Sequence, residues 1–154
     1  PSTALLTCIR QAAAKVPTGH RQQTWKSGSQ SALIPTAPYY ELLANGKTVD
    51  YKKLTGQLLE EEDFAVHESV AREHGFVLDV QRARPQTTKH VRVRPRFDNW
   101  AFVADFVVTD ESILPALESI MDVAGRLVGL GNWRPSAPTA PGPFGLFTAS
   151  VEVK

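Results

Sequence analysis

Gly129-Leu130-Gly131-Asn132-Trp133-Arg134-Pro135 lies at the centre of the region that decides the fold, which runs from Lys89 to Val153. Patterns typical of two strands, a helix, a glycine-rich loop and a final strand follow one another in this region. The two glycines allow a sharp turn with exposed N–H groups, the arginine offers a bidentate phosphate contact, and the tryptophan offers a stacking surface. A helix end with its tryptophan packed back on a sheet would leave the same pattern, so both interpretations stay open.

Two alternating runs precede this loop. The first, His90–Arg94, predicts a strand with basic residues on one face and valines on the other. The second runs from Trp100 to Val108 and is separated from the first by a turn at Asp98-Asn99. Together they predict a hairpin with one apolar side and one strongly basic side. A further strand is predicted at Phe76–Val80.

A long helix is predicted between this hairpin and the glycine-rich loop. Thr109 or Asp110 would cap it, and its apolar stripe continues to about Val128. We expect the stripe to pack on alternating aromatic residues of the second run. The stripe residues are Ile113, Leu117, Ile120, Met121 and Ala124, and the aromatic residues are Trp100, Phe102 and Phe106. A final strand from Phe144 to Val153 would close an antiparallel sheet.

The first 75 residues predict mainly helices. Residues 20–31 are polar and predict a loop, and residues 32–34 form a short apolar element. The expected helices run from Ser2 or Thr3 to about Val16, from Pro38 through Leu43, over Tyr51–Leu59 after a cap at Asp50, and over Asp63–His74. We therefore expect residues 1–75 to be the mainly helical part of the same domain, and residues 76–154 to be its sheet-forming half.

The composition sets limits on the class of protein. With 154 residues, 42% of them hydrophobic and 21% charged, the chain suits one folded domain and is not wholly disordered. No apolar run approaches the ~20 residues that a membrane span needs. A single cysteine, Cys8, excludes an internal disulfide and fits a reducing cytosol.

Charge is unevenly distributed although the formal net charge is only +1. Glu60–Asp63 is an acidic run, whereas the window from Arg82 to Arg96 contains no acid. The basic residues of this window are Arg82, Arg84, Lys89, Arg92, Arg94 and Arg96. Such a window predicts an anion-binding surface on a nearly neutral protein, although the solvated outer face of a sheet would have the same pattern.

The order hairpin, helix, glycine-rich loop, strand resembles the second half of a ferredoxin-like fold. Its loop is placed as in the repeat-associated RNA-binding proteins of CRISPR systems, the RAMP superfamily. The motif G-x-G-x-W-R-P with a later F-G-x-F, at Gly129–Pro135 and Phe144–Phe147, resembles a group of small uncharacterised bacteriophage proteins more closely. That group usually has a basic residue where this chain has Leu146. The resemblance covers about residues 76 to 153 and implies a ferredoxin-like, RAMP-like α+β fold and a nucleic-acid ligand.

These patterns together predict a module that binds single-stranded RNA or DNA, with arginines on the phosphates and an aromatic ring on a base. The resemblance implies that this module is phage-encoded. The candidate binding residues are Arg92, Arg94, Arg96, Arg126, Gly129, Gly131, Trp133 and Arg134. The alternative is a phage interaction or virion-assembly protein, including an inhibitor of a host defence complex. Both interpretations allow a homo-oligomer or assembly on a larger complex, in the bacterial host cytoplasm and without a membrane.

No catalytic residue, metal ligand or cofactor is predicted. His20 lies among cationic residues and would be the general base of a RAMP-type endoribonuclease, but no motif provides its partner. His67 and His74 share a predicted helix without a further ligand, which is weak support for zinc.

Overall fold

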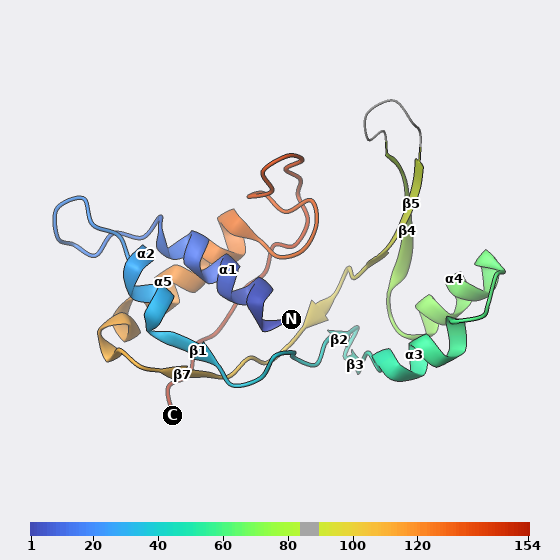
Figure 1. Cartoon of the computed structure of the whole chain (residues 1–154), viewed down its shortest axis with the longest axis horizontal. Coiled ribbons are helices and arrows are strands. Elements are labelled where there is room, and N and C mark those ends of the chain that lie inside the picture. Colours follow the sequence, from blue (N-terminus) through green and yellow to red (C-terminus); the bar gives the residue numbers. More distant parts are fainter. Residues whose placement is uncertain (84–89) are drawn as a thin grey trace. The chain divides into compact units, whose positions relative to one another are not determined.

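The chain forms two compact units in a computed structural model that describes residues 1–83 and 90–154 (Figure 1). The first unit comprises residues 1–40 and 104–154, and the second comprises residues 41–103. Each unit combines helices with small antiparallel sheets, so the fold class is α+β. The change of sequence pattern at residue 76 falls inside the second unit. Across the described residues, no helix combines the length and apolarity that crossing a membrane requires.

The long helix predicted after Asp110 is confirmed. It consists of a 3₁₀ turn η1 (Glu111–Ile113), helix α5 (Leu114–Val123) and a π-helical end η2 (Ala124–Val128). A carboxylate oxygen of Asp110 accepts a hydrogen bond from Ser112 N at 3.0 Å, which caps the first turn. The helix α1 (Ser2–Ala13) is also confirmed, although neither Ser2 nor Thr3 caps it, since its N-cap is Pro1.

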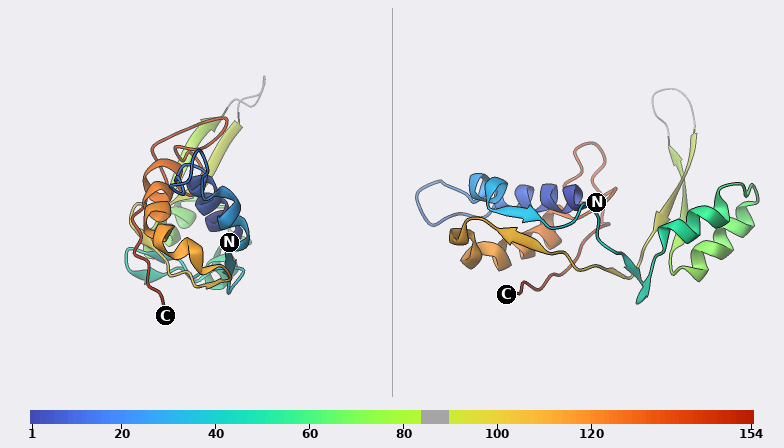
Figure 2. Two further views of the ribbon diagram at one scale, coloured as in Figure 1. Left: turned by 90° about the vertical axis from the view of Figure 1, so that its left-hand side faces the viewer. Right: turned by 60° about the horizontal axis from the view of Figure 1, so that its bottom comes forward.

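The core of the first unit forms where α1 packs against α5 and η2, which lie side by side in Figure 2. Ile113, Ile120 and Val128 are fully buried there. The expected packing of the stripe on aromatic residues is therefore wrong in part. Its partner is the apolar stripe of α1, and Trp100 and Phe102 belong to the second unit. The buried residues of α1 are Ser2, Leu5, Leu6, Cys8, Ile9, Ala12 and Ala13.

A short ladder completes the first unit. Strand β1 (Leu33–Pro35) pairs antiparallel with β7 (Phe106–Val108). The polar stretch predicted as a loop contains a short helix, α2 (Lys26–Ser31), which packs against α1.

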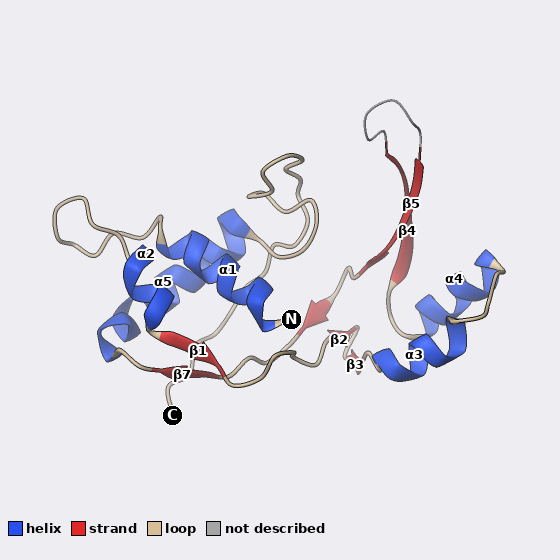
Figure 3. Ribbon diagram, in the orientation of Figure 1, coloured by secondary structure: helices blue, strands red, loops and turns tan. Residues whose placement is uncertain are grey.

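The predicted strand at Phe144–Val153 is absent, and Figure 3 draws this segment as loop. Its backbone bonds to the end of the long helix instead of a neighbouring strand. Phe147 N donates to Gly125 O at 3.2 Å, and Leu130 N donates to Gly145 O at 2.9 Å.

The second unit begins with a three-stranded sheet of β3 (Lys47–Thr48), β2 (Leu43–Ala44) and β6 (Trp100–Ala101). The helix predicted from Pro38 through Leu43 does not form. Asn45 and Gly46 have φ angles of 49° and 76°, which suit the tight turn between β2 and β3. Asn45 and Gly46 therefore form a hairpin turn.

Helices α3 (Tyr51–Leu58) and α4 (Phe64–Glu73) confirm both predicted helices of this region. Asp50 accepts hydrogen bonds from Lys52 N and Lys53 N, and Asp63 accepts one from Ala65 N. Two apolar residues of α4, Phe64 and Val66, are 43% and 38% exposed. Among the described residues of this unit, the buried hydrophobic ones are only Ala44, Ala71 and Phe76.

The basic strand pairs with a different partner from the one predicted. Strand β5 (His90–Arg96) pairs antiparallel with β4 (Val77–Ala83), while the alternating run from Trp100 to Val108 is divided between β6 and β7 in different sheets. The predicted hairpin of β5 with that run is therefore wrong. The described strands form three sheets of two, three and two strands, and the ferredoxin-like arrangement is not confirmed.

Candidate nucleic-acid interface

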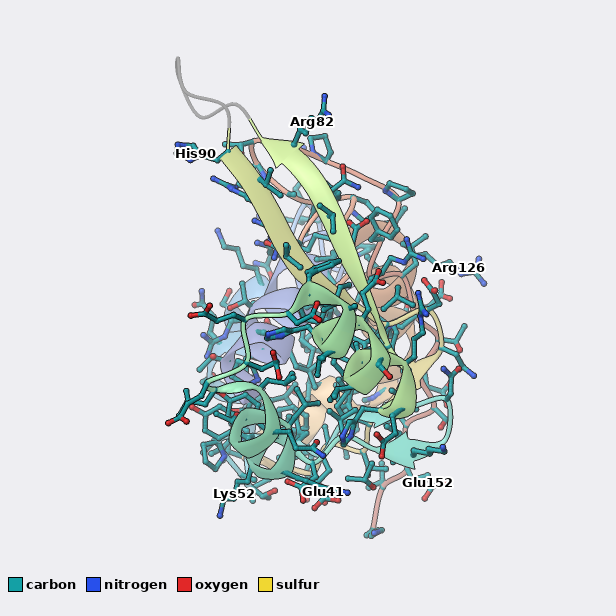
Figure 4. All side chains as sticks on the ribbon, turned by 90° about the vertical axis from the view of Figure 1, so that its right-hand side faces the viewer. Glu41, Lys52, Arg82, His90, Arg126 and Glu152 are labelled. Atoms are coloured by element: carbon teal, nitrogen blue, oxygen red, sulfur yellow. The ribbon has the colours of Figure 1, made fainter. Side chains whose placement is uncertain are left out.

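The pair β4–β5 forms a two-stranded ribbon that extends away from α3 and α4 within the second unit (Figure 4). Directly opposite residues of an antiparallel pair share a face. We call one side the basic face. It carries Arg92, Arg94 and Arg96 opposite Gln81, Asp79 and Val77, in that order, and His90 at the outer end of β5. The other side, the valine face, carries Leu78, Val80 and Arg82 opposite Pro95, Val93 and Val91. The arginine alternation predicted from the sequence is thus present, although on a different hairpin.

The base of the ribbon is held by polar and aromatic contacts. Asn45 Nδ2 donates to Gly75 O at 2.9 Å, immediately before β4. The rings of Phe76 and Phe97 lie with their centroids 5.1 Å apart. Because Phe76 is only 7% exposed, this ring pair forms most of the apolar anchor at the base.

Arg96 belongs to this anchor and not to the free part of the basic face. Its Nε lies 2.9 Å from Asp98 Oδ1 and its Nη2 lies 3.2 Å from Asp98 Oδ2, a bidentate pair. Its Nη1 is also 3.9 Å from Asp79 Oδ1. The hydrogen bond to Asp98 raises the pKa of Arg96 above its usual value. A phosphate contact by Arg96 would compete with these carboxylates.

Arg92 and Arg94 are the unpaired cations of the basic face. Within the described part of the chain, neither side chain has a hydrogen bond or an ion pair. Arg92 is exposed and Arg94 is half-buried. Arg82 and His90 lie at the outer end of the ribbon, as Figure 4 shows. Arg84 and Lys89, the remaining residues of the predicted basic window, lie outside the described residues.

The valine face is exposed as well. Val80, Val91 and Val93 are 50%, 68% and 46% exposed, and no second layer covers them among the described residues of this unit. A cluster of exposed apolar side chains is unusual on the surface of a monomeric protein.

The glycine-rich loop lies in the first unit, where its glycines end the long helix. Gly129, Gly131 and Trp133 all have positive φ angles, of 74°, 80° and 55°. Two of the loop's amides already have partners: Gly129 N donates to Ala124 O at 2.8 Å and Leu130 N to Gly145 O at 2.9 Å. The two halves of the sequence motif, Gly129–Pro135 and Phe144–Phe147, therefore meet, and each stabilises the backbone of the other.

Arg134 organises the same loop. Its Nη1 donates to Gly131 O and its Nε to Ser136 Oγ, both at 3.0 Å. Ser136 Oγ in turn donates to Gln11 Oε1 at 3.2 Å, which connects the loop to α1. Burial raises the pKa of the Cys8 thiol to about 11, partly offset by the positive charge of Arg134. The thiol therefore stays neutral near pH 7.

Trp133 and Arg126 also have partners inside the first unit. The Trp133 ring stacks on Phe144 with centroids 6.2 Å apart, and Arg126 Nε lies 2.7 Å from Asp122 Oδ1. The loop residues therefore have structural roles that do not require a ligand. Their contact with nucleic acid stays a prediction. Because the two arginine groups lie in different units, we treat them as separate surfaces.

The residues considered for catalysis do not form a cluster. His20 is exposed in the turn after α1, and its backbone N donates to Thr18 Oγ1 at 3.3 Å. His67 Nε2 lies 2.7 Å from Glu61 O, a local contact at the start of α4. Within residues 1–83 and 90–154, no three His, Cys, Asp or Glu side chains lie together as metal ligands would.

The sequence pattern did not indicate Gln81 as part of the basic face, whereas Arg82, from the predicted basic window, lies on the valine face. Their positions in β4 follow the predicted strand Phe76–Val80 directly, and continued alternation through Arg82 was the available signal. Comparison of the chain with known protein families, curated proteins and solved structures gives no match.

Proposed function

We propose that this protein is a nucleic-acid-binding module, phage-encoded and without catalysis of its own, whose contact surface is the basic face of the β4–β5 ribbon. The observation that supports this best is that Arg92 and Arg94 project from an extended ribbon without any described partner. Uncompensated arginines on a protruding element suit the regular negative charge of a phosphate backbone.

The resemblance to RAMP proteins and to small bacteriophage proteins supports the same ligand class. It rests on the sequence motifs, and the ferredoxin-like relationship is part of the proposal. Single-stranded RNA or DNA is the ligand that the sequence motif favours, because Trp133 could stack on a base while Arg134 of the same loop contacts the backbone. A RAMP-type endoribonuclease remains the less favoured version, with His20 as its base.

Neutralising both free arginines, Arg92→Gln with Arg94→Gln, should weaken binding and its dependence on salt. The logarithmic salt slope is about −0.7 per phosphate contact on single strands and about −0.9 on duplex DNA. Losing two contacts should therefore make the slope shallower by about 1.4 to 1.8. Fluorescence anisotropy with labelled polythymidine, polyuridine and a mixed-sequence duplex at several salt concentrations measures this change.

A charge-matched control separates a specific surface from net charge. Lys52→Gln with Arg72→Gln also removes two cations from the second unit, but from α3 and α4. The control should leave the slope nearly unchanged, and both double variants should keep the wild-type melting temperature. If both double variants lost affinity equally, only net charge would matter. A third variant, Arg126→Gln, tests the first unit: if it alone lost affinity, the binding surface would lie there.

A second candidate function, a phage interaction or virion-assembly protein, is favoured by the valine face and by the small core of the second unit. The ribbon has two open edges, and its exposed valines offer an apolar patch to a partner subunit. The same ribbon would then be an assembly surface, acting in a particle, on a filament or on a host defence complex.

Val80→Thr with Val93→Thr tests this candidate. Threonine keeps the β-branched shape while making the face polar, so the ribbon should persist. If the face mediates self-assembly, light scattering after size-exclusion chromatography should show oligomers for the wild-type protein and a smaller species for the variant. A wild-type protein that remains monomeric at high concentration, alone and with nucleic acid, would contradict self-assembly.

A further inference from the structure

The shape of the ribbon restricts which nucleic acid it fits. It pairs seven residues of β4 with seven of β5, and neighbouring strands lie about 4.8 Å apart. With side chains added, a two-stranded ribbon fits the B-DNA major groove, which is about 12 Å wide. The minor groove is about 6 Å wide, and the major groove of A-form RNA is too deep and narrow for side chains to read.

The chemistry of the basic face suits the edges of base pairs. Arg92 and Gln81 are directly opposite each other and both are exposed. Arginine binds guanine O6 and N7 bidentately, and a glutamine amide oxygen accepts from the amino groups of adenine or cytosine. Gln81 Nε2 donates to both Asp79 oxygens at 3.2 Å, which fixes the amide and leaves its oxygen available.

Residues flanking this pair on β5 can reach the backbone. Residues two apart along a strand share a face and are separated by about 6.8 Å. Arg94 and His90 lie on either side of Arg92 at this spacing. A central pair turned to the bases, with a flanking arginine and histidine turned to phosphates, is the division of roles that groove binding needs.

The same face lacks what single-strand binding uses. Its described positions carry no Phe, Tyr or Trp, whereas proteins that hold single strands stack bases on such rings. The aromatic residues nearest in sequence, Phe76 and Phe97, pair with each other at the base of the ribbon.

We infer that the ligand of the ribbon is duplex DNA, with the basic face in the major groove and Arg92 and Gln81 turned to the base edges. This inference rests on the proposed nucleic-acid-binding function. For the ribbon, duplex DNA replaces single-stranded RNA or DNA as the expected ligand.

The test compares four labelled probes of one mixed sequence with the full-length protein. They are B-form DNA of about 20 base pairs, which is two helical turns, the duplex RNA of that sequence, and the two DNA single strands. We expect the DNA duplex to bind about tenfold tighter than the others, because one good bidentate base contact contributes about 1–3 kcal/mol.

Base analogues then locate the groove. Replacing guanine by 7-deazaguanine removes the N7 acceptor from the major groove, and replacing it by inosine removes the amino group from the minor groove. The 7-deazaguanine duplex should bind at least about fivefold more weakly than unmodified DNA, and the inosine duplex should bind about as well as unmodified DNA. In Arg92→Lys, which keeps the charge but not the guanidinium fork, sensitivity to 7-deazaguanine should fall while the salt slope is unchanged. Val91→Thr, on the opposite face, should behave as wild type.

The outcomes distinguish duplex recognition from nucleic-acid binding in general. Equal or tighter binding of single strands or duplex RNA, or equal loss with inosine, would overturn duplex recognition and leave nucleic-acid binding intact. No affinity for any probe at low salt would overturn both.

Discussion

Ile120→Ala is expected to destabilise the first unit by about 2–5 kcal/mol, because it leaves a cavity in a packed core. Ile120 is 0% exposed and lies on α5 where that helix packs against α1. Urea denaturation followed by circular dichroism would measure the loss. Leu127→Ala is the control, since Leu127 is 56% exposed on η2 and should cost under about 1 kcal/mol.

The same comparison tests the packing itself. If aromatic residues of the run Trp100–Val108 formed the partner layer, as the sequence suggested, Phe106→Ala would cost as much as Ile120→Ala. In the structure Phe106 is half-buried on β7, with its ring centroid 6.3 Å from that of Tyr40. We therefore expect the Phe106 variant to lose less stability, and the reverse order would contradict the α1–α5 core.

Gly125→Ala should have the second largest effect. A Cβ at this position would overlap the carbonyl oxygen of Phe147, a backbone atom that cannot rotate away. Phe147 N is itself hydrogen-bonded to Gly125 O, so the C-terminal segment and η2 are in direct backbone contact. Forcing the two apart should cost about 1–3 kcal/mol or release the segment. Thermal unfolding and hydrogen exchange of residues 144–154 would show either result.

Gly56→Ala is the matched control with the opposite expected sign. Gly56 lies in α3, and a Cβ there would meet nothing within 4 Å. Alanine favours a helix over glycine by about 1 kcal/mol, so this variant should be neutral or stabilised. If Gly125→Ala were equally harmless and the exchange of residues 144–154 did not change, the close approach to Phe147 would not exist.

Helices α1, α3, α4 and α5 could be predicted because their signals are local. Asp50 and Asp63 precede α3 and α4 and cap them through their own side chains, and Gly75, with φ 83°, follows the second. The apolar stripe of residues 113–128 likewise fixes the buried face of one helix without reference to its partner. Caps and stripes depend on residues within a few positions of each other, which a sequence displays directly.

Strand pairing could not be predicted in the same way. The alternation from Trp100 to Val108 is real, but β6 pairs with Leu43–Ala44 and β7 with Leu33–Pro35. Alternation shows which side chains share a face and leaves the partner unspecified. The segment after Phe144 shows the same limit, because its backbone bonds to the end of a helix: Phe147 N donates to Gly125 O, and Gly145 O accepts from Leu130 N.

The candidate interface was partly predictable for a related reason. The period of two placed Arg92 and Arg94 on one face correctly, because it depends only on the strand. Whether an arginine is free depends on its tertiary neighbours. Asp98 holds Arg96, and Gly131 with Ser136 holds Arg134.

The insertion of the second unit between β1 and β7 has a consequence for the order of folding. Thr36 N donates to Asp105 O and so extends the β1–β7 ladder, and these two residues are 69 positions apart in the sequence. Closing so long a loop costs about 4 kcal/mol of chain entropy beyond a constant term. Once β2 has paired with β6, the free chain left to close is about ten residues, and this cost falls by about 2 kcal/mol. A chain in which β2 pairs with β6 first would therefore form the β1–β7 pairing faster than one that closes the whole loop in a single step.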